Sequence, residues 1–221
     1  MGKLLYVAKY PVGVNSRAKD VESLIDIKSI DVRMVGIHGL GGIGKTTIAK
    51  AVYNNIVDNF EGSCFLENVR ENSRTDDGTI KLQEKILSEI LPNQHLKVNN
   101  VSGGINVIKE RLCSKRVLLV LDDVNESEQI ENFLGKHDWL VSRSRVIITT
   151  RDEHLLTTLG KVCTTKTYKV KELDNHEALE LFSQYALQKV KPDEEYSELT
   201  NKALYYAKSL PLALTIIGSN L

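Results

Sequence analysis

A glycine-rich stretch at residues 39–47, GLGGIGKTT, carries the residue types best suited to chemistry in this chain of 221 residues. Four glycines fall within six positions, although glycine gives up more backbone freedom on folding than any other residue. The stretch fits the spacing G-x-x-x-x-G-K-[ST], with an apolar run at residues 35–37 before it and an amphipathic helical pattern after it. This context predicts a loop whose backbone amides surround a phosphate group.

Each residue type in this loop suits one part of a nucleotide. We expect Lys45 to reach the β- and γ-phosphates, the Thr46 hydroxyl to ligate Mg²⁺, and Thr47 to meet the α-phosphate. The alternative is a glycine-rich turn between a strand and a helix, with no ligand. The residues of the loop predicted to bind the nucleotide are Gly39, Gly41, Gly42, Ile43, Gly44, Lys45, Thr46 and Thr47.

Two adjacent acids follow the apolar run at residues 117–121. A run of five apolar residues is typical of a strand covered on both faces, and ligands of open α/β sheets bind beyond the carboxyl ends of such strands. We therefore predict that Asp122 holds Mg²⁺, through water or Thr46, and that Asp123 positions or deprotonates an attacking water. The alternative is that both acids cap the next helix.

A third strand pattern ends in two hydroxyls and a guanidinium, at residues 147–151, IITTR. If this strand lies beside the strand of the glycine-rich loop, Arg151 could contact the γ-phosphate and distinguish ATP from ADP. We therefore predict a catalytic group of Lys45, Asp123 and Arg151. A solvent-exposed or salt-bridged Arg151 remains the alternative.

The charge balance excludes a general attraction to nucleic acid or to anionic membranes, since 29 basic and 29 acidic residues cancel. The longest apolar run is far shorter than the roughly 20 residues of a membrane-spanning helix, and the apolar patch at residues 4–8 is shorter than the core of a signal peptide, which has about 7–15 residues. We expect a cytoplasmic protein, with the nucleus as a second location, and reduced thiols at Cys64, Cys113 and Cys163.

Strand-like runs alternate with helical patterns from residue 33, which predicts an α/β fold with a parallel sheet. Residues 99–104 read as a loop. Asp174 and Glu177 form a capping-box start to a purely helical region. We divide the chain into an N-terminal segment (1–32), an α/β domain (33–172) and a helical subdomain (173–221). The expected strands cover residues 33–37, 63–69, 116–121, 145–149 and 167–170, and the expected helices include residues 82–90, 105–112, 126–134 and 196–207.

Taken together, these motifs resemble the NB-ARC nucleotide-binding domain of plant NLR disease-resistance proteins, within the AAA-like signalling ATPases. Asn125 follows the acidic pair and Val124, where the coiled-coil branch has Trp, so the chain looks similar to the TIR-type branch. Besides the P-loop, the stretches that carry the resemblance are residues 65–70, 118–124, 144–152, 168–182 and 210–214.

The resemblance implies a P-loop NTPase with a five-stranded parallel sheet flanked by helices, followed by a small helical subdomain. It implies that the Arg151 strand lies between the P-loop strand and the Asp122 strand. It also implies that Pro211 packs against the adenine or ribose and that backbone near Val14 reaches the adenine edge. The alternatives are a Pro211 that only starts a helix, and an entering strand at residues 12–14.

The resemblance also sets expectations about partners. The chain ends before the family's second helical subdomain, and the family joins this domain to TIR and leucine-rich-repeat domains, so we expect such partners and a homo-oligomer in the ATP-bound state. Ser209 stands where the family usually has glycine. If that backbone is left-handed, the serine costs roughly 1 to 2 kcal/mol.

Three functions compete at this stage. The first is a switch between ADP-bound and ATP-bound states with slow ATP hydrolysis, and with ATP or ADP and Mg²⁺ as ligands. The second is a scaffold that holds nucleotide without turnover and acts through partner contacts. The third is a metabolic or GTP-using P-loop protein, which the lack of an N-K-x-D guanine motif disfavours.

Overall fold

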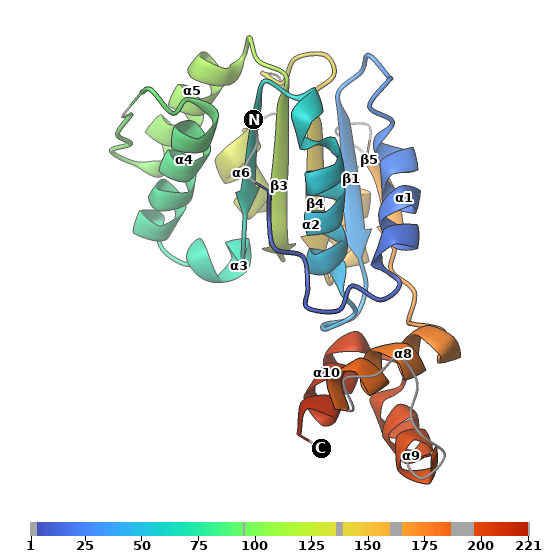
Figure 1. Ribbon diagram of the computed structural model, residues 1–221. Coiled ribbons are helices and arrows are strands. Elements are labelled where there is room, and N and C mark those ends of the chain that lie inside the picture. Colours follow the sequence, from blue (N-terminus) through green and yellow to red (C-terminus); the bar gives the residue numbers. More distant parts are fainter. Residues whose placement is uncertain (1–3, 95, 136–138, 160–164, 187–196, 221) are drawn as a thin grey trace.

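Five parallel strands form the single sheet of the computed structural model, which describes residues 4–94, 96–135, 139–159, 165–186 and 197–220 (Figure 1). Their order across the sheet is β2-β3-β4-β1-β5. The predicted five-stranded parallel sheet is confirmed, and so is the place of the Arg151 strand between the P-loop strand and the Asp122 strand. The strands are β1 (Arg33–His38), β2 (Gly62–Leu66), β3 (Val117–Val124), β4 (Arg145–Thr150) and β5 (Thr165–Lys169).

Strand β3 shows how the sheet separates two cores. Leu119 and Leu121 point into one buried cluster, whereas Leu118 and Val120 point into the other. Successive side chains of a strand face opposite sides of the sheet, so an unbroken apolar run fills both cores. The helices that cover the first cluster are α4 (Asp76–Ile90), α5 (Val101–Leu112), α6 (Ser127–Leu134) and α7 (Glu153–Leu159), and those that cover the second are α1 (Val14–Ile25) and α2 (Lys45–Ile56).

Three helices form a separate small core beyond the carboxyl ends of the strands (Figure 1). They are α8 (Asn175–Ala186), α9 (Ser197–Ala207) and α10 (Pro211–Ser219). The capping box predicted at the start of α8 is confirmed: the Glu177 N–H donates to Asp174 Oδ1 at 2.8 Å, and the Asp174 N–H donates to Glu177 Oε2 at 3.1 Å. The core of these helices contains Leu173, Leu181, Phe182, Ala203 and Leu214.

Several local predictions were wrong at element boundaries. Residues 99–104 are not all loop, because α5 begins at Val101 and the Asn100 side chain accepts the Gly103 N–H at 2.7 Å. Strand β3 continues through both acids instead of ending before them. The entering strand considered at residues 12–14 is absent from the described chain, since Val14 begins helix α1, which packs on α2. Two short elements, η1 (Val57–Asn59) and α3 (Val69–Asn72), complete the fold.

The turn before α10 has the left-handed backbone that would make Ser209 costly. Ser209 has φ 55° and Lys208 has φ 47°, both in the left-handed region that favours glycine. Cys64 is a buried free thiol whose pKa is raised by burial, Cys113 is a free exposed thiol, and Cys163 lies outside the described residues. Within the described ranges, no helix has both the length and the apolar character needed to cross a membrane.

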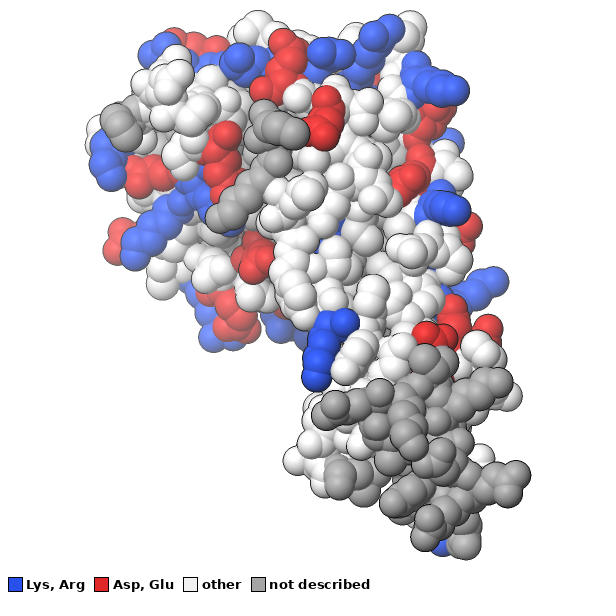
Figure 2. All heavy atoms as spheres, in the orientation of Figure 1, with Lys and Arg blue, Asp and Glu red and all other residues white. Residues whose placement is uncertain are grey.

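Acidic and basic side chains are interspersed on the surface. On the face drawn in Figure 2, red and blue side chains are mixed along the left, top and right of the α/β part, around a largely uncharged middle. Equal numbers of opposite charges in such a mixed pattern give no strong field of one sign over that face. An anion site on this protein must therefore be local.

Candidate functional site

A pocket of about 400 Å³ lies at the carboxyl ends of the central strands, between the α/β part and helices α8 and α10. Gly39 and Asp122 do not line this pocket, but each accepts a hydrogen bond from a residue that does. Lys45 donates to Gly39, and Thr46 donates to Asp122. The structure therefore brings the sequence-predicted site residues together. Those that line the pocket are Val14, Gly41, Gly42, Ile43, Gly44, Lys45, Thr46, Thr47, Asp123, Arg151 and Pro211.

The P-loop needs its glycines for two physical reasons. Gly42 and Gly44 have φ 76° and 98°, where side chains are strained. A Cβ on Gly42 would also come within 2.8 Å of Leu212 Cβ, because the Leu212 N–H donates to the Gly42 carbonyl at 3.2 Å. The loop is thus fastened to the start of α10 through Leu212, a contact that the sequence reading missed.

Lys45 lies under the P-loop with only 7% of its surface exposed. Its Nζ donates to the carbonyls of Gly39 at 3.0 Å and Leu40 at 2.8 Å. Burial lowers the pKa of Lys45, and the positive charge of Arg151 lowers it further. A charged ammonium that is short of compensating negative charge favours an anion beside it, and phosphate oxygens supply that charge.

Asp122 is a buried carboxylate bound by two threonine hydroxyls. Its Oδ1 accepts from Thr46 Oγ1 at 2.8 Å and from Thr149 Oγ1 at 2.7 Å, and the residue is 1% exposed. Each hydroxyl has a single proton, so Thr46, which lines the pocket, keeps its oxygen lone pairs as acceptors when it donates to Asp122. This donor set fits Mg²⁺, with Thr46 as ligand and Asp122 orienting it.

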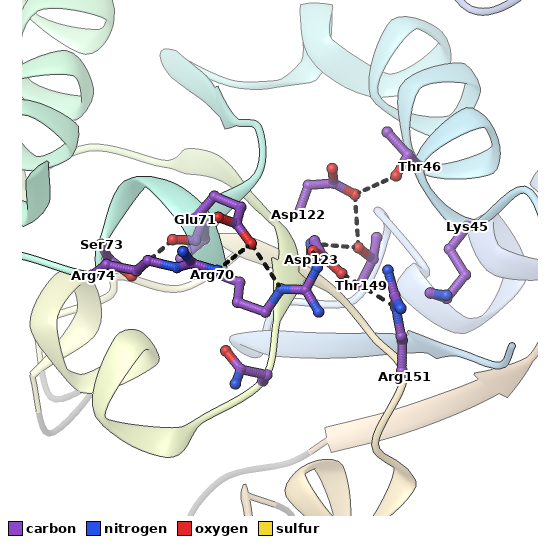
Figure 3. Close-up of polar contacts among 12 residues, drawn as sticks. Lys45, Thr46, Arg70, Glu71, Ser73, Arg74, Asp122, Asp123, Thr149 and Arg151 are labelled. Atoms are coloured by element: carbon purple, nitrogen blue, oxygen red, sulfur yellow. Dashed lines mark hydrogen bonds and ion pairs between the residues drawn. The ribbon is translucent and has the colours of Figure 1, made fainter. Parts of the chain in front are cut away.

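Asp123 has a different environment from its neighbour (Figure 3). Its backbone is left-handed, with φ 57°, and its N–H donates to Thr149 Oγ1 at 2.9 Å. One carboxylate oxygen lies 3.0 Å from Arg70 Nη2, and the other lies 3.8 Å from Arg151 Nε. The carboxylate at the pocket wall is therefore shared between two arginines.

The alternative that the acids cap the next helix is wrong. Helix α6 is capped by Glu126, whose side chain forms a capping box with Gln129. The alternative for Arg151 is partly right, because its side chain is 57% exposed and forms an ion pair with Asp123. Arg151 nevertheless lines the pocket, since β4 lies directly beside β1.

Apolar and aromatic side chains line part of the pocket. Tyr10 and Tyr185 meet edge to face there, with ring centroids 5.0 Å apart. Pro211, at the first position of α10, lines the same pocket, as does Val14. A planar apolar ring such as adenine suits this lining. The sequence did not predict that either tyrosine lines the site, because both lie outside the motifs.

Arg17 joins the two sides of the pocket. Its guanidinium donates to both carboxylate oxygens of Glu177, at 2.7 and 2.8 Å, and to the carbonyls of Gly13 at 2.8 Å and Glu172 at 3.0 Å. The hydrogen bond from Arg17 lowers the pKa of Glu177. Helix α1 is thus tied to helix α8 at the edge of the pocket.

The comparison with protein families agrees with this geometry. A family model described as the NB-ARC domain matches residues 17–191. The chain belongs to the NB-ARC family. Membership of this family, together with the P-loop NTPase fold, implies nucleotide binding by this NB-ARC domain, usually with Mg²⁺.

Curated relatives of this NB-ARC domain are plant disease-resistance proteins. Disease resistance protein RUN1 of Vitis rotundifolia is 44% identical over 208 residues, which are 94% of this chain and 15% of that protein. TMV resistance protein N of Nicotiana glutinosa is 40% identical over 215 residues, 94% of this chain and 18% of that protein. The relatives are of the TIR-type branch, as Asn125 predicts. The chain thus spans less than a fifth of the length of these two relatives.

A solved structure supports the fold at low sequence identity. The crystal structure of Cdc6p from Pyrobaculum aerophilum aligns with a TM-score of 0.61 over 93% of this chain and 65% of that chain, at 12% identity. At that identity the likeness concerns the arrangement of the strands and helices alone. The P-loop fold of this NB-ARC domain is thus shared with a protein of very different sequence.

Proposed function

We propose that this NB-ARC domain is an adenine-nucleotide switch in plant defence signalling. The observation that carries the proposal is the buried, desolvated Lys45 beneath a glycine loop that is fastened to α10. Phosphate oxygens at this point would compensate the charge of Lys45 and accept hydrogen bonds from the loop amides. Because α10 belongs to the helical group, the ligand would be held by both parts of the chain.

In this proposal, different residues bind different parts of the nucleotide. Gly39, Gly41, Gly42, Ile43, Gly44 and Thr47 form or support the loop around the phosphates, Lys45 neutralises them, and Val14 and Pro211 border the base. Thr46 and Asp122 would hold Mg²⁺, which when bound neutralises phosphate charge. The apolar and aromatic side chains that line the pocket suit adenine, and the chain has no N-K-x-D motif for guanine.

The switch requires a contact that ATP makes and ADP does not. Arg151 could make this contact with the γ-phosphate, since it lines the pocket and its exposed side chain forms a long ion pair with Asp123, at 3.8 Å. A ligand shifts an equilibrium by no more than its differential affinity for the two states. In this proposal, ADP favours a closed arrangement of the α/β domain (33–172) and the helical subdomain (173–221), with the segment 1–32 on the adenine side. ATP favours an open one that forms homo-oligomers.

Slow ATP hydrolysis would reset the switch, with Asp123 positioning or deprotonating water. One observation favours the second candidate, a scaffold that holds nucleotide without turnover: the Asp123 carboxylate is already engaged by Arg70 and Arg151. Steady-state phosphate release from wild type and Asp123→Asn separates these functions. A loss of about 100-fold or more in Asp123→Asn supports general-base catalysis, whereas equal background rates support the scaffold.

The principal test is the identity of the bound nucleotide. Denatured wild-type protein should release ADP or ATP, and added ATP should compete for the site better than GTP does. Lys45→Arg should carry much less nucleotide, because the longer guanidinium cannot take the place of Nζ beneath the loop. The control is Lys50→Arg, on the same helix but ion-paired to Glu67. Wild-type protein that carries and binds no nucleotide would overturn the proposal.

The wider context follows from the family. We propose that this domain works beside TIR and leucine-rich-repeat domains of a larger NLR, in the cytoplasm or the nucleus, without a specific nucleic-acid or membrane partner. The disease-resistance names of its relatives and the small part of their length that it spans support this context.

A further inference from the structure

Arg70 contacts Asp123 from outside the nucleotide pocket. It lies on the short helix α3, which follows the edge strand β2, and its Nη2 is 3.0 Å from Asp123 Oδ2. Arg151 lies on the pocket side and is 3.8 Å from the other oxygen. In Figure 3, Asp123 lies between the two arginines.

The two arginines are held differently. The Arg70 side chain is 33% exposed and lines a second hollow of about 450 Å³, together with Arg74 and Asn125. Its Nε is buried and donates no hydrogen bond, with Glu71 Oε1 at 3.7 Å. Arg151 is 57% exposed and faces the P-loop, where a Cβ on Gly41 would lie 3.3 Å from its guanidinium. Of the two, Arg151 is the arginine that can turn to a phosphate.

We propose that Arg70 is a positioning residue that releases Arg151 for the γ-phosphate, and so sets the preference of the site for ATP over ADP. This inference rests on the proposed nucleotide switch. When one close cation already compensates the charge of a carboxylate, the loss of a second cation costs less energy. With Arg70 in place, Asp123 keeps a partner when Arg151 turns to the phosphate, so the turn costs little Coulomb energy.

Removal of Arg70 affects ATP more than ADP for two reasons. Asp123 would hold Arg151 more firmly, which withdraws the guanidinium from the γ-phosphate. The region would also lose one positive charge, and ATP carries one more negative charge than ADP. Both effects lower the ratio of ATP affinity to ADP affinity, and we expect a fall of roughly three- to tenfold in Arg70→Gln.

The experiment is calorimetric titration of the chain with Mg-ATP and Mg-ADP, which does not depend on turnover. Arg70→Gln should lower the affinity ratio, and Arg70→Lys should keep most of it because the ammonium retains the charge. Arg74→Gln is the matched control, since Arg74 lies four residues further along the chain, just beyond α3, pairs with Glu71 at 2.8 Å and carries the same charge. It should leave the ratio unchanged.

A double mutant isolates the pair. In an Asp123→Asn background, Arg70→Gln should lower the ratio much less than it does in wild type, because the carboxylate that it positions is gone and only the loss of one positive charge remains. If Arg70→Gln weakens ATP and ADP equally, or if the Arg74→Gln control lowers the ratio as much, Arg70 is only structural and the inference is wrong. If wild type binds both nucleotides and Arg70→Gln keeps the wild-type ratio, the inference fails while the proposed function stands. If wild type binds neither nucleotide, both fail.

Discussion

Asp122 and Asp123 are neighbours on one strand, yet the contacts of their carboxylates differ. Asp122 is 1% exposed, and two hydroxyls donate to its Oδ1 at 2.7 and 2.8 Å. Asp123 has a side chain that is 20% exposed, a left-handed backbone, and two arginines at 3.0 and 3.8 Å. Both acids emerge at the same edge of the sheet, but only the second faces the pocket.

The contacts of Asp122 with its two threonines form a fixed set, whereas the contacts of Asp123 with its two arginines form a movable set. Donors that are buried and hydrogen-bonded to one oxygen cannot leave without exposing an unpaired polar group, which costs about 1–3 kcal/mol each. Ion pairs at the surface are worth little and exchange partners readily. Asp122 is therefore suited to hold a metal ligand in one place, and Asp123 is suited to respond to the nucleotide.

The largest expected effect comes from breaking the fixed set. Asp122→Ala leaves the Thr46 hydroxyl without its acceptor, and we expect the affinity for Mg-ADP to fall by about 10- to 100-fold. Titration with ADP in the presence of Mg²⁺ and in the presence of a chelator measures the metal-dependent part. Asp122→Asn keeps an acceptor oxygen and should lose less. An equal loss with and without Mg²⁺ would argue against a metal role for Asp122.

The ion pair of Arg17 and Glu177, which joins α1 to α8, should be costly to break, like the fixed set. Arg17 and Glu177 have side chains only 13% and 19% exposed, and Arg17→Gln should lower the free energy of unfolding by about 2 kcal/mol at pH 7. The pKa of Glu177 is lowered in the folded protein, so its contribution is present above its ordinary pKa of 4.5 and is lost as the pH falls through the folded value.

Urea unfolding at several pH values checks this prediction. The difference between wild type and Arg17→Gln should be constant near neutral pH and should shrink in acid below pH 4.5. Arg116→Gln, which breaks an exposed pair with Glu61, is the control and should leave stability unchanged. A difference that is insensitive to acid would mean that Arg17 acts through its carbonyl contacts alone.

The sequence predicted the fixed part of the site better than the movable part. The P-loop spacing and the apolar run before Asp122 are local patterns, and a parallel sheet brings the ends of its strands to one edge, so Lys45, Thr46 and Asp122 could be placed together. The place of the Arg151 strand between the P-loop strand and the Asp122 strand followed from the family resemblance. Thr149 lay in a predicted strand, but its hydrogen bond to Asp122 could not be read from spacing.

The contacts that the sequence did not predict join distant segments of the chain. Arg70 stood within a motif and Glu177 was identified as a cap, yet their partners lie 53 and 160 residues away (123 − 70 and 177 − 17). Long side chains of this kind leave no periodic signal. The tyrosines at positions 10 and 185 were likewise invisible, because their ring contact exists only once α8 packs near the N-terminal segment.

Breaking the movable set should change selectivity and leave stability alone. Arg151→Gln should lower the affinity for ATP by about tenfold while ADP binding stays the same, because a charge-assisted contact to the γ-phosphate is lost. Since the side chain is 57% exposed, the midpoint of unfolding should not change. Competition of ATP and ADP for a bound fluorescent nucleotide measures this, with Arg111→Gln as an exposed control. Equal losses for ATP and ADP would contradict a γ-phosphate contact.

The smallest effect separates backbone strain that serves chemistry from strain that does not. Ser209 and Asp123 have nearly the same left-handed φ, 55° and 57°. Ser209→Gly relieves this strain but adds chain entropy to the unfolded state, so we expect stability to rise by about 0.5–1 kcal/mol. Ser88→Gly, at an exposed position in the last turn of α4, should have the opposite sign, since glycine destabilises a helix.

Asp123→Gly completes the comparison, because it relieves the same strain while it removes the carboxylate that pairs with Arg70 and Arg151. It should be about as stable as wild type or slightly more stable, yet it should raise the preference for ATP, because Arg151 is then free for the γ-phosphate, whereas Ser209→Gly should leave the preference unchanged. Urea unfolding and nucleotide titration on the same samples give both quantities. If Asp123→Gly left the ATP preference at the wild-type value, the left-handed backbone at Asp123 would need an explanation other than the placement of its carboxylate between two arginines.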